Sequence, residues 1–186
     1  YSFTITAPSS AVPTLSLATT RINNSVPSSW GIYVQGQSGV TITATAAGYQ
    51  GSTISSYTIS GGATGTQSSN VFTISTIYSS GTITYTVKVT DSRGRTATAS
   101  TSISVVAYSA PAFSATDAFR CIANGTASDT GTYISAKATG TFSSVSSKNS
   151  MTLKVQYALS TSGAYSTAVT LTNGTASIIG NGSIDI

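Results

Sequence analysis

The side chains able to do chemistry in this chain are few, and the sequence places none of them together. The 186 residues include one cysteine, no histidine and four acidic residues, all of them aspartates. Without histidine, catalytic triads that use it as the base are excluded, and so are histidine-ligated metal sites. A glycosidase needs two facing carboxylates and a calcium site needs clustered ones. The aspartates show no such clustering and stand at Asp91, Asp117, Asp129 and Asp185. We therefore expect no enzyme, no metal and no cofactor.

Cys121 is the only thiol, so no disulfide can form within the chain and the fold must depend on its core. A reactive cysteine would need a histidine or a cationic pocket, and only Arg120 adjoins it in sequence. We expect Cys121 to be a small buried hydrophobic residue in a strand.

Composition excludes several partners. The net charge of +4 comes from scattered basic residues with no basic run, so we expect no nucleic-acid binding. No apolar stretch reaches the length that a bilayer span requires. Over a third of the chain is Ser or Thr, whereas 6% is charged and 39% hydrophobic. A glycosylated low-complexity stalk would share the hydroxyl content but lack the alternation of Thr with Ile, Val and Tyr, which favours half-buried strands.

The elements needed to position any site are all predicted strands. In the first hundred residues they fall near 13–18, 31–35, 39–47, 53–60, 70–76, 82–90 and 95–106. The last two alternate strictly and are joined by residues 91–94, where Gly94 supplies a positive φ and Asp91 stabilises the turn. Seven short strands without a helical period predict an all-β fold of tandem immunoglobulin-like sandwiches, with a closed barrel as the alternative. Further strands are expected near 112–122, 131–142, 151–159, 164–171 and 176–179.

Two segments indicate that one domain is used twice. Residues 39–48 and 131–140 share Gly, Ile, Ala, Ala and Gly at the same spacing, and Tyr57 matches Tyr157 further on. We expect residues 1–9 to hold the last strand of a preceding domain plus a linker, and residues 10–107 a complete sandwich. Residues 108–186 would form a second, related sandwich that ends before its final hairpin, so that more chain or a partner must complete its sheet. Tight turns are expected at the Asn-Gly pairs starting at residues 124, 173 and 181.

A family resemblance covers nearly the whole chain in order. The segments that carry it are residues 27–36 (PSSWGIYVQG), 46–54 (AAGYQGSTI), 89–96 (VTDSRGRT) and 107–111 (AYSAP). Phe119-Arg-Cys, Asn124-Gly-Thr and Gly131-Thr-Tyr continue the pattern. These segments resemble minor structural proteins from the tails of long-tailed phages and prophages of Gram-positive bacteria. The resemblance implies tandem immunoglobulin-like modules in a tail fibre, tail tip or baseplate, located on the virion and free of assigned activity, with copies of the same chain or other tail proteins as partners.

Two functions follow from these expectations. The first is a virion structural module that extends the tail toward the host, and the second is an adhesin module whose loops bind a host receptor or cell-wall polysaccharide. A bacterial surface adhesin built from the same modules is a third possibility. For glycan contacts we nominate Trp30, Tyr33 and Tyr49, because aromatic faces stack on sugar rings and these three adjoin Gly-rich loops. Core or inter-strand packing is the competing role for Trp30.

Overall fold

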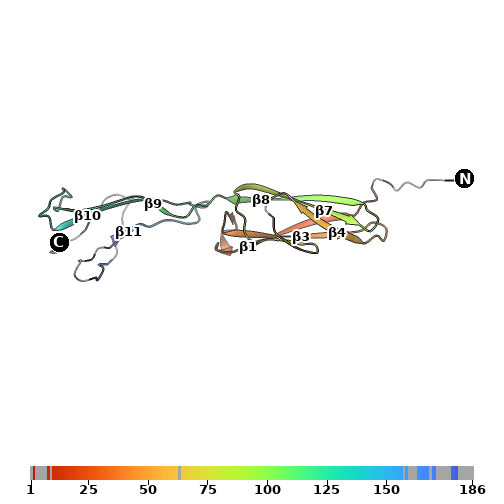
Figure 1. The fold of residues 1–186 in the computed structure, drawn as a ribbon, viewed down its shortest axis with the longest axis horizontal. Coiled ribbons are helices and arrows are strands. Elements are labelled where there is room, and N and C mark those ends of the chain that lie inside the picture. Colours follow the sequence, from red (N-terminus) through yellow and green to blue (C-terminus); the bar gives the residue numbers. More distant parts are fainter. Residues whose placement is uncertain are drawn as a thin grey trace. The chain divides into compact units, whose positions relative to one another are not determined.

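The computed structural model describes residues 2, 8, 10–62, 64–156, 158, 163–167, 169–170 and 177–179. The chain divides into two compact units, residues 1–108 and 109–186, which are treated separately below (Figure 1). Within the described ranges, regular structure consists of strands and one short 3-10 helix, η1 (Ser28–Trp30). The predicted all-β class is therefore confirmed.

Unit 1 is a sandwich of two four-stranded sheets. The first sheet has the order β1-β3-β6-β5, and the second has the order β2-β8-β7-β4. All neighbours are antiparallel except β2 and β8, which are parallel. A closed barrel, the alternative from the sequence, is wrong for this unit. The strands are β1 (Thr14–Asn23), β2 (Tyr33–Val34), β3 (Ser38–Ala47), β4 (Ile54–Ser60), β5 (Thr66–Ser68), β6 (Val71–Ile74), β7 (Gly81–Asp91) and β8 (Thr96–Val106).

The core of unit 1 lies between the two sheets, because both contribute to one cluster of buried side chains. Alternate residues of each strand face inward, as a pleated strand requires. From β7, for example, Tyr85 and Val87 are fully buried, whereas Thr84 and Thr86 lie on the outer face and pair with serine hydroxyls of β8 at 2.8 Å. The buried cluster comprises Val40, Ile42, Ala44, Phe72, Ile74, Ile77, Ile83, Tyr85, Val87, Ile103 and Val105.

The β7–β8 hairpin forms as the sequence predicts. Gly94 has φ +77°, and its amide donates to the Asp91 carbonyl oxygen at 2.9 Å. A side chain at that φ would be strained, so glycine permits the short connection. The two strands then remain in register from Thr90 opposite Thr96 to Gly81 opposite Val105.

Unit 2 contains a three-stranded antiparallel sheet of order β13-β10-β9 and a separate two-stranded pair, β11 with β12. Cys121 closes β9 and is fully buried, as expected from the sequence. Several large apolar side chains of this unit are exposed, among them Phe113 at 68%. The strands are β9 (Ala112–Cys121), β10 (Tyr133–Thr141), β11 (Lys154–Val155), β12 (Val169–Thr170) and β13 (Ser177–Ile179).

The strands predicted from alternation occur where expected, usually to within a few residues. The exceptions are β5, which the sequence analysis did not include, and β11, β12 and β13, of which short stretches are described. Of the predicted Asn-Gly turns, Asn124-Gly125 is present, and the Asn124 side-chain oxygen accepts the Thr126 amide at 3.0 Å. The predicted strand at residues 1–7 and the turns at 173 and 181 lie outside the described residues. The limits of the three predicted domains and the truncation of the second copy stay predictions.

Candidate functional site

Two ends of unit 1 carry the aromatic residues nominated from the sequence. We call the end that holds residues 48–53 and 92–95 the Tyr49 pole, and the end that holds residues 24–37 and 75–80 the Trp30 pole. The register of β1 with β3 runs from Thr14 opposite Ala47 at the first pole to Asn23 opposite Ser38 at the second. Ten residues at about 3.3 Å each separate the poles by roughly 33 Å.

At the Tyr49 pole, arginines from the β7–β8 turn hold the β3–β4 loop. The Arg93 guanidinium donates to the Tyr49 carbonyl oxygen at 3.3 Å and to the Gln50 carbonyl oxygen at 2.9 Å. The Arg95 guanidinium carbon lies 5.9 Å from the centre of the Tyr49 ring, within the range of a cation–π contact. Tyr49 itself remains 39% exposed. The loop is therefore fixed while one aromatic side chain stays accessible.

Asp91 lies beneath this pole and organises it. One carboxylate oxygen accepts the backbone amides of Arg93 at 3.0 Å and Arg95 at 2.8 Å. The other accepts the Ser52 hydroxyl at 2.9 Å and lies 3.2 Å from the Arg95 guanidinium. Burial raises the pKa of the Asp91 carboxyl, whereas the hydrogen bonds it accepts and the Arg95 guanidinium lower that pKa, and the net result lies below the ordinary 3.8.

The position of Asp91 decides what it can do. The residue is 1% exposed, and both of its carboxylate oxygens are used by groups of its own unit. A carboxylate in that position joins the β3–β4 loop to the β7–β8 turn and does not meet a substrate. The expectation that Asp91 stabilises the turn is confirmed.

At the Trp30 pole, Arg21 joins the end of β1 to the helix η1 and to β2. Its guanidinium donates to the Asn23 side-chain oxygen at 2.6 Å and to the Ser28 carbonyl oxygen at 2.9 Å. The guanidinium carbon also lies 5.8 Å from the centre of the Tyr33 ring. Trp30 and Tyr33 are both partly buried. Tyr33 packs against the buried core of the unit, which leaves its ring less accessible to a sugar than that of Tyr49.

The three nominated residues therefore do not form one site. Trp30 and Tyr33 share the Trp30 pole, whereas Tyr49 stands at the other end of the same sandwich. Any ligand that Tyr49 contacts would have to be recognised by the loops of its own pole.

The sequence analysis missed a hollow on the outer side of the first sheet, beside the edge strand β5. Its volume is about 390 Å³, and we call it the Tyr78 groove. Tyr78 is 74% exposed, compared with 39% for Tyr49, whereas Trp30 and Tyr33 are partly buried. Sequence offered only a weak signal for it, a tyrosine followed by Ser-Ser-Gly at the start of a strand. The lining residues are Thr64, Gly65, Thr66, Thr73, Ser75, Thr76 and Tyr78.

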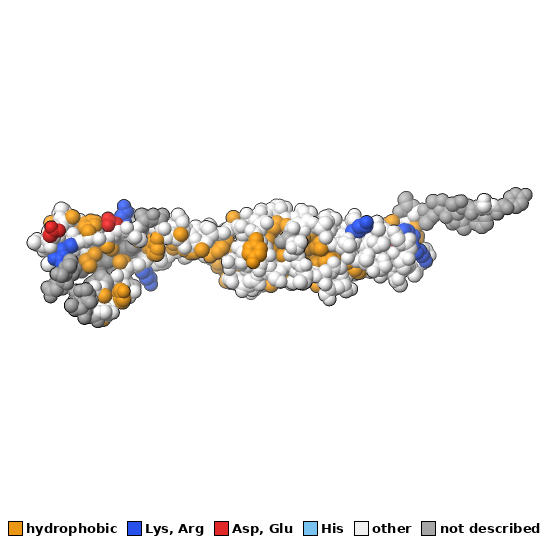
Figure 2. Space-filling model, viewed as in Figure 1, with side chains coloured by type: hydrophobic (Ala, Val, Ile, Leu, Met, Phe, Trp, Pro, Cys, Tyr) orange, Lys and Arg blue, Asp and Glu red, His pale blue; other side chains and the backbone are white. Residues whose placement is uncertain are grey.

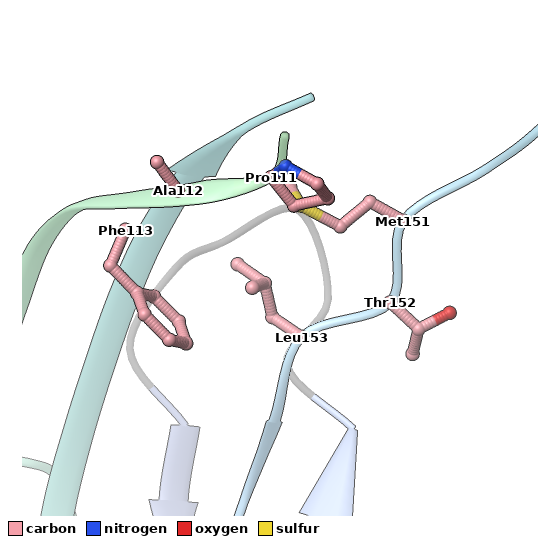
Figure 3. Close-up of a pocket in the computed structure, with 6 residues that line it drawn as sticks. All are labelled: Pro111, Ala112, Phe113, Met151, Thr152 and Leu153. Carbon is pink, nitrogen blue, oxygen red and sulfur yellow. The ribbon is translucent and has the colours of Figure 1, made fainter. Parts of the chain in front are cut away.

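Unit 2 has a smaller, apolar hollow of about 210 Å³ between the start of β9 and the segment before β11. Figure 3 shows Phe113, Leu153 and Met151 facing one another across it, while the hydroxyl of Thr152 points away. The hollow offers apolar contact without convergent polar groups, so it lacks the features that would orient a small ligand.

Among the described residues, no group of three or more His, Cys, Asp or Glu side chains is close enough to hold a metal ion, and no helix has the length and apolarity to cross a membrane. Comparisons of the chain with protein-family models, with curated proteins and with solved structures found no match.

Proposed function

We propose that the chain is a non-catalytic structural module of a phage tail fibre, tail tip or baseplate, which extends the tail toward the host surface. Two observations support this proposal. The sequence segments described above resemble those of tail minor structural proteins, and unit 1 is a sandwich of two four-stranded sheets, the architecture that an immunoglobulin-like module would have. Such sandwiches are widely used as rigid, repeatable units, although a fold alone does not specify a function.

The single observation that carries the proposal is the direction of the chain through unit 1. Strand β1 begins at the Tyr49 pole with Thr14. Strand β8 ends at the Trp30 pole, where Val105 is opposite Gly81 and Val106 is opposite Val34 of β2. A unit that the chain crosses from pole to pole adds its full length to an array of such units. A unit whose two chain connections both lay at one pole would add little length to such an array.

The surface of unit 1 suits a passive extension. Figure 2 shows that its visible face is mostly neither charged nor hydrophobic. The outer face of β7 and β8 consists of serine and threonine hydroxyls with Lys88 as the only charge. Two pairs of these hydroxyls, Thr84 with Ser102 and Thr86 with Ser100, hydrogen-bond across the strands. Such a face stays hydrated without attracting charged partners.

Location on the particle is the first prediction. Virions purified from a host that encodes this chain should contain it, and gold-labelled antibodies raised against residues 10–107 should decorate the tail of intact particles in electron micrographs. An antibody against a capsid protein serves as the control for labelling elsewhere. Recovery of the chain only from the host cell wall, with undecorated tails, would instead support the bacterial surface adhesin.

The adhesin function is kept as a second candidate because Tyr49 is exposed on a loop that Arg93 and Arg95 hold in place. Under this candidate, Tyr49→Ala should weaken binding of the 186-residue chain to host cells by roughly tenfold or more, the effect of losing one anchoring aromatic side chain. Trp30→Ala, at the opposite pole, is the matched control and should leave binding unchanged. Circular dichroism melts of both variants check the fold. Equal cell binding by folded Tyr49→Ala and the unchanged chain would exclude the Tyr49 site.

A further inference from the structure

The Tyr78 groove is lined by hydroxyl groups and one aromatic ring. Five of its residues are Thr or Ser, one is Gly65 and one is Tyr78, and none carries a charge. Its volume of about 390 Å³ is within the range of small-molecule sites, roughly 300–1,000 Å³. An uncharged lining of this kind does not suit an anion, a cation or a nucleotide phosphate. It suits a neutral ligand that has many hydroxyls and an apolar face.

The segment that carries Tyr78 is held rigidly from behind. The Gln35 side-chain amide donates to the Tyr78 carbonyl oxygen at 2.8 Å, and the Asn24 side-chain amide donates to the Ser75 carbonyl oxygen at 2.7 Å. Ile77, between them, is fully buried in the core. Two backbone hydrogen bonds complete the support, from the Ile77 amide to the Ser38 carbonyl oxygen at 2.9 Å and from the Gly36 amide to the Ile77 carbonyl oxygen at 2.7 Å.

This support fixes the backbone of Tyr78 while its side chain is 74% exposed. Its neighbour Ile77 is fully buried, so the chain is anchored in the core immediately before the exposed tyrosine. A tyrosine on a fixed backbone loses little further conformational freedom when a ligand stacks on it, so the groove is preorganised for binding.

The floor of the groove is formed by paired strands. Thr66 of β5 and Thr73 of β6 are directly opposite each other, and both side chains lie on the outer face because Phe72 and Ile74 point inward. Gly65 lets the backbone of β5 approach β6 closely, since a Cβ at that position would overlap the Thr73 carbonyl oxygen. The two strands therefore place their hydroxyls at a separation set by the sheet.

The hydroxyl surface continues beyond the groove. Thr73 is also opposite Thr41 of β3, and Thr41 is opposite Thr20 of β1. Together with Thr66, these residues form a row of four threonines across all four strands, spaced by the strand separation of about 4.8 Å. The row provides a neutral polar path from the groove across the outer face of the sheet.

We propose that the Tyr78 groove binds a neutral saccharide, with a sugar ring stacked on Tyr78 and its hydroxyls bonded to Thr66, Thr73 and Ser75. Carbohydrate presents an apolar ring face together with a periphery of hydroxyls, and the groove offers a partner for each. This activity goes beyond the structural role proposed above and does not depend on it. It also differs from the Tyr49 site in its residues and in its place on unit 1.

The test uses the full 186-residue chain and short neutral oligosaccharides of glucose, galactose, rhamnose and N-acetylglucosamine, with oligogalacturonate and an uncharged extended peptide as comparisons. Two-dimensional NMR should show that at least one neutral oligosaccharide shifts the amides of residues 64–66 and 73–78. Tyr78→Ala should weaken that binding by roughly tenfold or more. Tyr78→Phe should retain most of it, because the ring face remains.

Thr73→Val gives a second, nearly isosteric variant that removes one hydroxyl from the floor and should also weaken binding. Tyr165→Ala removes an equally exposed tyrosine (73%) of the other unit, so it is the matched control and should leave saccharide binding unchanged. Fluorescence of Trp30, the only tryptophan, verifies that each variant of unit 1 is folded. The proposal is overturned if no neutral oligosaccharide binds, if folded Tyr78→Ala binds equally well, or if the charged sugar or the peptide occupies the groove more tightly.

Discussion

Replacing Phe72 by alanine should destabilise unit 1 more than any single change on its surface. Phe72 is 1% exposed and belongs to the buried cluster between the two sheets, where it is opposite Ile42 in register. Truncating a buried phenylalanine to alanine lowers the free energy of unfolding by about 3–5 kcal/mol, because apolar contacts are lost and a cavity is left behind. A domain of this size has a free energy of unfolding of about 5–15 kcal/mol in total, so the substitution removes a large part of it.

The measurement follows Trp30 fluorescence during urea unfolding of the 186-residue chain. Since Trp30 is the only tryptophan and lies in unit 1, its signal reports that unit alone. The midpoint for Phe72→Ala should fall sharply with the slope unchanged, as expected when stability changes and the surface exposed on unfolding does not. Tyr78→Ala provides the control, because truncating an exposed aromatic side chain should alter stability by about 0.5 kcal/mol or less. A Phe72→Ala loss below about 1 kcal/mol would contradict the packing described here.

The faces of the strands were predictable because the periodicity is local. In β7 the apolar residues Ile83, Tyr85 and Val87 alternate with threonines, and burial follows that alternation residue by residue. Strand β5 was missed for the same reason. Its residues are Thr-Gln-Ser, all exposed, and an edge strand with two wet faces has no alternation to detect. Its pairing with β6 depends on the backbone of the neighbouring strand instead.

The pairing of β2 could not be foreseen either. Two residues, Tyr33 and Val34, pair in parallel with the end of β8, about seventy residues later in the chain. Nothing in the sequence near Tyr33 specifies that pairing. It results from how the two sheets close over their shared core. The all-β class of unit 1 was therefore predicted from the number and spacing of its strands, while the partner of each strand is set by long-range contacts.

The candidate sites show the same division between local and long-range information. The role of Asp91 in the β7–β8 turn could be predicted, because the amides that donate hydrogen bonds to its carboxylate belong to residues two and four positions further on. Its bond to Ser52 spans 39 residues and could not be inferred from local pattern. Residue type nominated Tyr49 together with Trp30 and Tyr33, but type alone could not show that the other two lie at the opposite pole.

Asp91→Asn should lower the stability of unit 1 at neutral pH and remove part of its sensitivity to acid. The folded pKa of Asp91 lies below its ordinary 3.8, so the carboxylate contributes stability that is fully present above the unfolded pKa. That contribution is lost as the pH falls through the folded pKa, where the carboxyl becomes protonated. An asparagine keeps the shape but lacks the charge, and its NH₂ group cannot accept the bonds that a carboxylate oxygen accepts.

The difference in unfolding free energy between the natural chain and Asp91→Asn should therefore be largest near pH 7. It should narrow as the pH falls from 3.8 through the lower folded pKa, below which both side chains are neutral. Urea titrations followed by Trp30 fluorescence at a series of pH values measure that difference. Asp117→Asn is the matched control, because Asp117 lies on the exposed strand β9 of the other unit and should leave the Trp30 transition unchanged at every pH. If the free energies of unfolding of the natural chain and Asp91→Asn changed in parallel with pH, this prediction would be wrong. The charge of the carboxylate would then not stabilise the loops of the Tyr49 pole, although the carboxylate is paired with Arg95.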